Sequence, residues 1–202
     1  MLKRAVTHES GFTLIEVVVT LVIFSILATL AVPAMNRWIS NVKIRSTADA
    51  LQNGLRMAQA ESLRRSRQVV FSLTNSPTPQ TSLTAAANGN YWSINTIPSM
   101  TDGTEGSQFV ESGPLTSITS GVTVTGPAAL CFNSMGRLVA NAATGINGAN
   151  CALPGGTPPV QSYQITLPSA DRPLRVDVAL GGQVHMCDPA KTLSSTDPDG
   201  CQ

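Results

Sequence analysis

The chain has 202 residues, enough for one ordinary domain and an additional element but too few for two large domains. Charged residues make up 12% of the chain, about half of the ~25% that is usual in soluble domains, and the formal net charge is +1. This near-neutral balance excludes nucleic-acid binding that depends on a strongly basic chain.

The charges are unevenly distributed along the sequence. Residues 37–67 hold seven basic and two acidic side chains, whereas residues 68–202 hold four basic and eight acidic ones. The pattern therefore predicts a basic stalk followed by a mildly acidic head.

The N-terminal region predicts a helix that spans a membrane. Residues 1–11 are short and polar and include Lys3 and Arg4, and residues 17–35 then contain no charge. Nineteen helical residues extend over roughly 28 Å, close to the ~30 Å hydrocarbon core of a bilayer. The two cations favour a cytoplasmic leader, so we expect the rest of the chain to lie on the opposite side of the membrane.

A secretory signal peptide cleaved near Ala34 is the alternative interpretation. Glu16 argues against it, because an acidic residue in the apolar core costs ~2.5–3.5 kcal/mol at the bilayer centre. Helix-compatible sequence also continues past the apolar stretch, and the boundary between polar and apolar sequence at Gly11-Phe12 is abrupt.

The segment Gly11-Phe12-Thr13-Leu14-Ile15-Glu16, followed by an apolar run with Pro33, resembles the class III signal of type IV pilins and type II secretion pseudopilins. The resemblance implies that a prepilin peptidase cleaves after Gly11 and methylates the new amine of Phe12. Glu16 would become the fifth residue of the mature chain and would neutralise that amine or the amine of a neighbouring subunit. A polar residue that merely reaches the membrane interface remains the alternative for Glu16.

Helical periodicity continues to residue 67. Pro33 should kink this helix, because proline cannot donate a hydrogen bond to the carbonyl of Thr29. Small and apolar residues then form a one-sided stripe that we expect to pack on a sheet: Ile44, Ala48, Leu51, Leu55, Ala58 and Ser62, widened by Met57 and Leu63. The arginines at 64, 65 and 67 could form a nucleic-acid patch, but they better fit cations at the C-terminus of a helix.

Beyond residue 67 the pattern changes to short strands separated by Gly, Pro and Asn clusters. We expect an α+β head, with the helix packed against an antiparallel sheet and a hairpin turn at Gly181-Gly182. The predicted strands are residues 68–74, 91–97, 122–125, 129–132, 138–140, 162–167, 174–178 and 184–187.

The four cysteines lie between residues 131 and 201, without a C-x-x-C motif and with only His8 and His185 as further histidine ligands for a metal. This pattern favours two disulfides in an oxidising compartment over a metal site. Three pairings are possible, of which Cys131–Cys151 and Cys187–Cys201 close the shortest loops. We expect no metal, no cofactor and no enzymatic activity, since no catalytic constellation stands out.

Three further segments resemble GspH/FimT-type minor pilins and pseudopilins: residues 47–62, 132–138 and 174–189. The resemblance implies a minor pilin that takes part in type IV pilus assembly or priming. A minor pseudopilin of a type II secretion system is the first alternative, and a DNA receptor for natural transformation is the second.

The DNA-receptor alternative is weakened at the tail. Some FimT-type proteins bind DNA through a Gly-Arg-x-Arg tail, whereas this chain has Gln183 and His185 at the two arginine positions. The remaining candidates for phosphate contacts are Arg172, Arg175, His185 and Lys191.

The expected organisation has three parts: a prepilin leader at residues 1–11, a membrane and filament-core helix at 12–40, and a head at 41–202 that includes the amphipathic helix 41–67. The expected location is a bacterial inner membrane, crossed once with the head in the periplasm, and later a filament. The expected partners are a prepilin peptidase, other major and minor pilins or pseudopilins, and the inner-membrane assembly platform.

Overall fold

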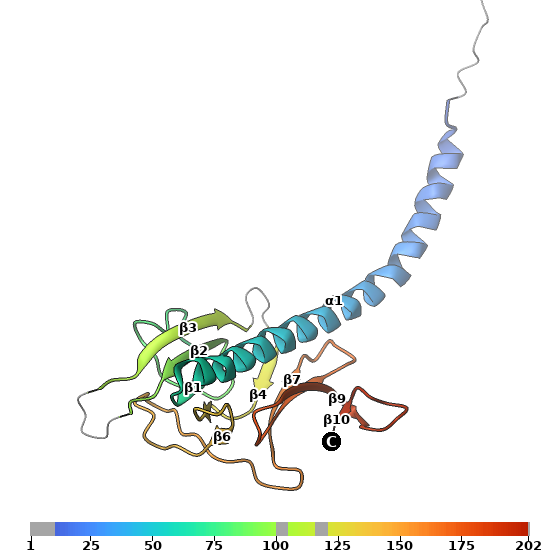
Figure 1. Cartoon of the computed structure of the whole chain (residues 1–202). Coiled ribbons are helices and arrows are strands. Elements are labelled where there is room, and N and C mark those ends of the chain that lie inside the picture. Colours follow the sequence, from blue (N-terminus) through green and yellow to red (C-terminus); the bar gives the residue numbers. More distant parts are fainter. Residues whose placement is uncertain (1–10, 100–104, 116–120, 202) are drawn as a thin grey trace, which may run out of the picture.

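The computed structural model describes residues 11–99, 105–115 and 121–201. Its first element is the 52-residue helix α1 (Leu14–Arg65), which projects from the head and curves along its length (Figure 1). The helix ends where Ser66 adopts a left-handed conformation with φ 51°. Arg64 and Arg65 thus lie in its last turn, which confirms the expected helix C-terminus.

The head contains two sheets of five strands each. The first, sheet 1, is antiparallel throughout and has the order β3-β2-β1-β5-β6. Its strands are β1 (Val69–Thr74), β2 (Tyr91–Thr96), β3 (Gln108–Pro114), β5 (Ala129–Phe132) and β6 (Leu138–Val139).

Sheet 2 has the order β10-β9-β8-β7-β4, and all its pairings are antiparallel except that of β9 with β10. Its strands are β4 (Thr123–Thr125), β7 (Val160–Thr166), β8 (Leu174–Ala179), β9 (Val184–Thr192) and β10 (Gly200–Cys201). The hairpin between β8 and β9 turns at the expected glycine pair. Gly182 there has φ +90°, and a Cβ atom on it would lie 1.9 Å from the carbonyl oxygen of Gly136.

The α+β prediction is confirmed, with one long helix on an antiparallel-rich head whose strands are divided between two sheets. All eight predicted strands are present, seven with small shifts of their ends and β9 with an extension from residue 187 to Thr192, whereas β3 and β10 were not expected. β3 is a largely exposed edge strand with the sequence QFVESGP, which lacks the alternation of apolar residues that marks a half-buried strand. β10 has only two residues.

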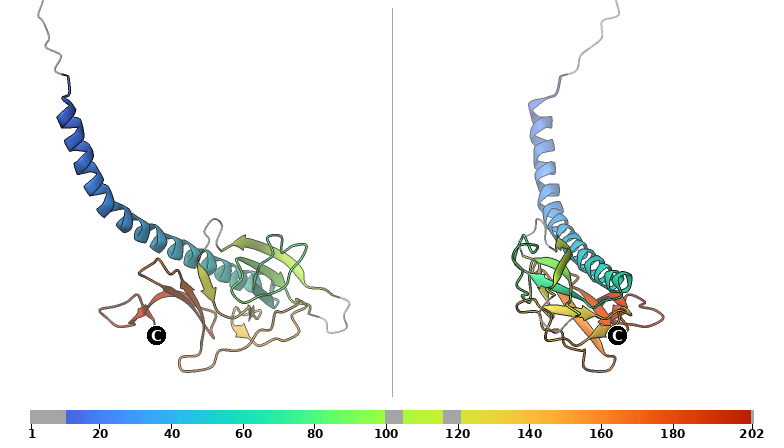
Figure 2. Two further views of the ribbon diagram at one scale, coloured as in Figure 1. Left: turned by 180° about the vertical axis from the view of Figure 1, so that it is seen from behind. Right: turned by 60° about the vertical axis from the view of Figure 1, so that its left-hand side comes forward.

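The second half of α1 packs over both sheets. Figure 2 shows sheet 2 beneath the middle of the helix and sheet 1 beneath its C-terminal end. The predicted stripe is buried, since its six members from Ile44 to Ser62 are at most 1% exposed. Met57 and Leu63, which were expected to widen the stripe, are instead 41% and 51% exposed, because they lie outside the arc that faces the strands.

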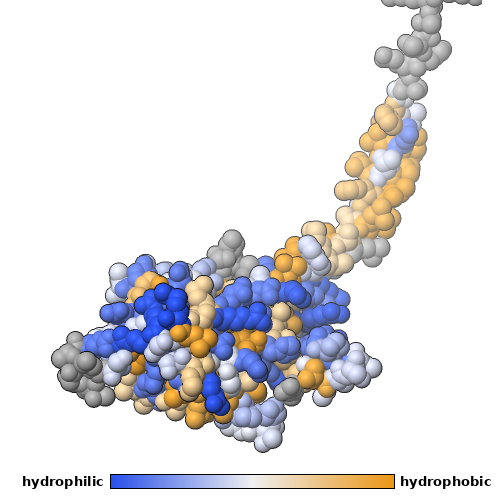
Figure 3. Space-filling model, viewed as in Figure 1, coloured by the Kyte–Doolittle hydropathy of each residue, from blue (hydrophilic) through white to orange (hydrophobic). Residues whose placement is uncertain are grey.

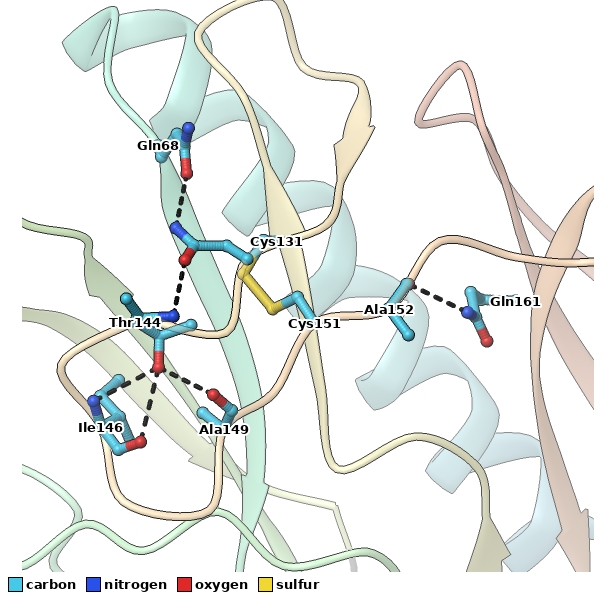
Figure 4. The surroundings of a disulfide bond; sticks show 10 residues. Gln68, Cys131, Thr144, Ile146, Ala149, Cys151, Ala152 and Gln161 are labelled. Atoms are coloured by element: carbon cyan, nitrogen blue, oxygen red, sulfur yellow. Dashed lines mark hydrogen bonds between the residues drawn. A yellow bond between two sulfur atoms is a disulfide. The ribbon is translucent and has the colours of Figure 1, made fainter.

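Each sheet is also covered on the face that lies away from the helix. In sheet 1, Val70 and Cys131 point to this face and form a second apolar cluster with Cys151 and Ala149 from the following loop. The bond between Cys131 and Cys151 fastens the loop over the strands (Figure 4). Thr144 lies in the same loop and donates a hydrogen bond to the carbonyl of Ala149, at 2.9 Å.

In sheet 2 the C-terminal residues cover the face that lies away from the helix. Val176 and Val178 of β8 belong to the core beneath the helix, so Asp177 between them points to the opposite face. There the bond between Cys187 and Cys201 holds the chain end close to Asp177, whose Oδ2 atom lies 3.6 Å from the sulfur of Cys187. The two pairings are those that the sequence favoured among three.

Candidate functional site

The predicted processing site lies at the start of α1, away from the head (Figure 1). Gly11 and Phe12 are exposed, and the side chain of Thr13 caps the helix by accepting a hydrogen bond from the backbone N–H of Glu16, at 3.4 Å. Glu16 lies in the first turn, where a carboxylate interacts favourably with the helix dipole. Thr13 and Glu16 have the spacing of a capping box, a signal that the sequence analysis missed.

The first half of α1 exposes an apolar surface on all sides. Of the 18-residue window that is long and apolar enough to cross a membrane, 0% is buried within the protein. Figure 3 shows this part of the helix as a nearly continuous hydrophobic surface, in contrast to the mixed surface of the head. A core helix of a soluble protein would be buried, so this surface requires a membrane or another protein to cover it.

The polar side chains in this exposed half satisfy their own hydrogen bonds. The hydroxyls of Thr20, Ser25 and Thr29 donate to the carbonyls three residues earlier, at 2.9, 2.8 and 2.7 Å. Groups paired in this way can enter an apolar environment at low cost. The helix therefore keeps its apolar character despite three hydroxyl groups.

Pro33 lies inside α1, which remains one continuous helix past it. Figure 1 shows the helix curving between its exposed half and the half that packs on the head. The missing hydrogen bond to the carbonyl of Thr29 favours such a bend. A sharp kink at Pro33 itself stays a prediction.

The candidate phosphate-binding residues lie near the C-terminal strands, and two of them are paired with carboxylates. Nη2 of Arg175 lies 2.8 Å from Oδ2 of Asp177, and Nζ of Lys191 lies 2.8 Å from Oδ2 of Asp199. The hydrogen bond to Asp199 raises the pKa of Lys191 and lowers the pKa of the Asp199 carboxyl. These ion pairs reduce the charge that a polyanion would meet.

Arg172 and His185 line a cavity of about 650 Å³ between α1 and strands β8 and β9 of sheet 2. Arg45 adds a second arginine, while Asp188 and Asp199 contribute two acidic groups to the same walls. The structure thus brings two of the four candidates together, but in surroundings whose charges balance.

One group of potential metal ligands exists among the described residues, formed by Asp177, Cys187 and Cys201. Its two sulfur atoms are bonded to each other and cannot act as thiolate ligands. The group therefore belongs to the disulfide of sheet 2.

Comparison with known proteins agrees with the N-terminal geometry. The family model of the prokaryotic N-terminal methylation motif matches residues 7–32, which include the polar–apolar boundary and Glu16. No curated protein sequence matches the chain.

Two crystal structures of the type IV minor pilin FimU from Pseudomonas aeruginosa strain PAO1 are similar to the chain. The first has 14% sequence identity and a TM-score of 0.49, and the match covers 75% of this chain and 96% of FimU. The second, in another crystal form, has 16% identity and a TM-score of 0.46, with 72% and 96% covered. The match to the methylation motif thus covers the start of a long helix whose second half packs on an antiparallel-rich head.

Proposed function

We propose that the chain is a structural minor pilin, cleaved after Gly11 by a prepilin peptidase and assembled into a type IV pilus through the exposed half of α1. The observation that carries this proposal is the division of α1 into two halves. The second half is buried against both sheets, whereas the apolar first half has no partner within the described residues.

Glu16 supplies the charge through which the exposed half of α1 would pair with an adjacent subunit. It is the one carboxylate on an otherwise uncharged apolar stretch, and an unpaired charge there is costly. Cleavage after Gly11 creates a cationic amine at Phe12, about one helical turn from Glu16. Pairing of Glu16 with this amine, or with the amine of an adjacent subunit, would satisfy both charges.

The head belongs in the periplasm in this proposal. Both disulfides lie on the outward faces of the sheets, and such bonds persist in oxidising compartments. The chain would cross the inner membrane once and then leave it as part of the filament. Its partners would be the prepilin peptidase, other pilins and the inner-membrane assembly platform, and its role is structural rather than catalytic.

Co-expression with a prepilin peptidase tests the processing step. The mature chain should begin with methylated Phe12 and contain 202 − 11 = 191 residues, as measured by mass spectrometry. Gly11→Leu should leave the precursor uncut. An N-terminus near Met35, or an intact chain beside an active peptidase, would contradict the proposal.

A second pair of variants tests assembly separately from processing. Glu16→Gln removes the charge but keeps a residue that suits the third position of a capping box, so the helix should begin as before. This variant should be cleaved normally and yet be lost from sheared filaments. Thr20→Ala, one turn further along the same exposed helix, is the matched control and should be incorporated. The same assay run with a type II secretion machinery distinguishes a pilus subunit from a minor pseudopilin.

A further inference from the structure

The cavity between α1 and sheet 2 lies beside the point where α1 leaves the head. Trp38, Val42 and Arg45 of the helix contribute to its walls, together with Met186 and Asp188 of β9. Its volume of about 650 Å³ is within the range of sites that hold small molecules. Trp38 is 67% exposed, so the walls present an apolar surface as well as charged groups to a ligand.

The apolar stretch of α1 sets the level of this cavity relative to a membrane. Residues 17–35 carry no charge, and the window that could cross a membrane is 0% buried within the described part of the protein. Trp38 follows this stretch about 4.5 Å further along the helix axis, within the headgroup layer of roughly 5–7 Å on each side of the hydrocarbon core. Tryptophan is enriched at this level of membrane proteins. The cavity therefore opens beside lipid headgroups when the apolar half of α1 spans a bilayer.

The curvature of α1 keeps the charged part of the cavity near the same level. Arg45 lies at most about 15 Å beyond Met35 along a straight helix. Figure 1 shows α1 bending between its apolar half and the half that packs on the head, so the distance from the membrane grows more slowly than the length of the helix. Arg45 and Arg172 are both exposed, and such long side chains can extend their guanidinium groups back toward the headgroups.

The charged groups on the walls are of both signs. Arg45 and Arg172 are matched in number by Asp188 and Asp199. Asp199 pairs with Lys191, at 2.8 Å, whereas Asp188 and the two arginines make no ion pair within the part of the chain that the structure describes. A ligand with one anionic and one cationic group can satisfy the charges that the protein leaves open, whereas a simple anion would leave Asp188 unpaired.

We propose that the cavity between α1 and sheet 2 binds the headgroup of phosphatidylethanolamine, a zwitterionic phospholipid, while the chain is in the membrane. The inference rests on the membrane-spanning arrangement of α1 proposed above. Arg45 and Arg172 hold the phosphate, because guanidinium groups match its geometry, and Asp188 accepts hydrogen bonds from the ammonium group. Trp38 packs on the glycerol and the upper acyl chains. The bound lipid holds the head at the membrane surface until the chain leaves the bilayer.

Native mass spectrometry of the full chain tests the site with defined lipids. The protein is taken from detergent that contains equal amounts of phosphatidylethanolamine, phosphatidylcholine and phosphatidylglycerol with identical acyl chains. The chain should retain phosphatidylethanolamine about threefold more than either competitor, because phosphatidylcholine has no N–H donor and phosphatidylglycerol has no cation for the carboxylate. Equal retention of the three lipids, or a preference for phosphatidylglycerol, would overturn the proposal.

Variants that remove single charges assign the preference to the cavity. Asp188→Asn should abolish the preference for phosphatidylethanolamine over phosphatidylglycerol, and Arg45→Gln with Arg172→Gln should reduce the retention of all three lipids about threefold. Glu111→Gln and Arg137→Gln are the matched controls at exposed positions in and beside sheet 1, and both should keep the natural preference. An unchanged preference in Asp188→Asn, or an equal loss in the controls, would also overturn the proposal.

Quenching of tryptophan fluorescence separates this inference from the proposed function. The chain has two tryptophans, and Trp92 is only 8% exposed in the core of the head, so quenching by brominated lipid reports on Trp38. In vesicles that contain phosphatidylethanolamine, lipid brominated near the headgroup should quench more strongly than lipid brominated at the end of the acyl chain. Such quenching without selective lipid retention would reject the headgroup site and leave the minor-pilin role standing. No quenching by either lipid would reject both the site and the membrane-spanning arrangement on which that role depends.

Discussion

Gly54 on α1 and Phe71 on β1 lie so close that a Cβ atom on Gly54 would be 3.0 Å from Cε2 of the Phe71 ring. The same atom would lie 3.1 Å from Cδ2 of Trp92, whose ring stacks beside Phe71 with centroids 6.3 Å apart. Both rings are buried. Gly54 thus lets the helix approach sheet 1 closely, which accounts for a residue that lowers helix propensity by about 1 kcal/mol relative to alanine.

This contact predicts a position-specific sensitivity to size. Gly54→Leu should reduce the free energy of unfolding by about 2–3 kcal/mol, because the larger side chain must displace two buried rings. Asn53→Leu, on the exposed face one residue earlier, should change it by less than about 0.5 kcal/mol. Urea unfolding of a head fragment that begins at Asn41 measures both values, and equal losses would contradict the prediction.

The two disulfides predict separate losses of stability. Replacing both cysteines of either pair with serine should cost about 2–4 kcal/mol, since the bonds close loops with separations of 20 and 14 residues. The loss should be greater for Cys131 and Cys151, because they belong to an apolar cluster in which a serine hydroxyl would be buried. Peptide mapping without reduction should recover these two pairings, and a different connectivity would contradict them.

Glu61 predicts a loss of stability in acid. Hydrogen bonds from Arg64 and then Arg65 lower the pKa of Glu61 from its usual 4.5 to about 2. A carboxyl whose pKa is lower in the folded state contributes stability that is complete above pH 4.5 and is lost as the pH falls toward 2. Glu61→Gln should therefore be less stable than the natural chain at pH 7, by about 0.5 kcal/mol for exposed pairs, and the difference should vanish near pH 2. A difference that is constant over this range would contradict the prediction.

The sequence revealed those features whose signal is local. The stripe from Ile44 to Ser62 could be read because a helix that buries one face repeats every three to four residues. The methylation motif that matches residues 7–32 could be anticipated from Gly11, Phe12 and Glu16 because these residues lie within two helical turns of one another. Each pattern lies within one continuous segment, so the separation of its residues in the sequence determines their distances in the structure.

The features that the sequence did not reveal depend on tertiary contacts. The division into two sheets follows from pairings between strands that are far apart in the chain, such as β1 with β5 and β4 with β7. β10 forms because the Cys187–Cys201 bond brings the chain end beside β9. The cavity between α1 and sheet 2 joins Trp38 to Met186, which are far apart in the chain, and no spacing rule connects them.

The ion pair between Lys191 and Asp199 leads to the last prediction, which concerns DNA. Lys191 also lies 3.5 Å from Asp197, and Arg175 is held by Asp177, so the cations near the tail face carboxylates of the head itself. Residues 68–202 carry eight acidic and four basic side chains, so this part of the head repels a polyanion at long range.

A head fragment that begins at Asn41 should therefore bind duplex DNA only weakly at physiological salt, with a Kd in the range of about 10⁻⁴–10⁻⁶ M that is typical of nonspecific binding. Asp197→Asn together with Asp199→Asn should strengthen this binding, because the double change releases Lys191 from its ion pairs. Gel-shift titrations at two salt concentrations measure both effects. Tight binding by the unmodified head, abolished by Arg172→Ala or Lys191→Ala, would contradict the prediction and favour a DNA receptor. Binding that disappears only when the stalk arginines at 64, 65 and 67 are replaced would assign the residual attraction to the helix end and leave the head without a DNA site.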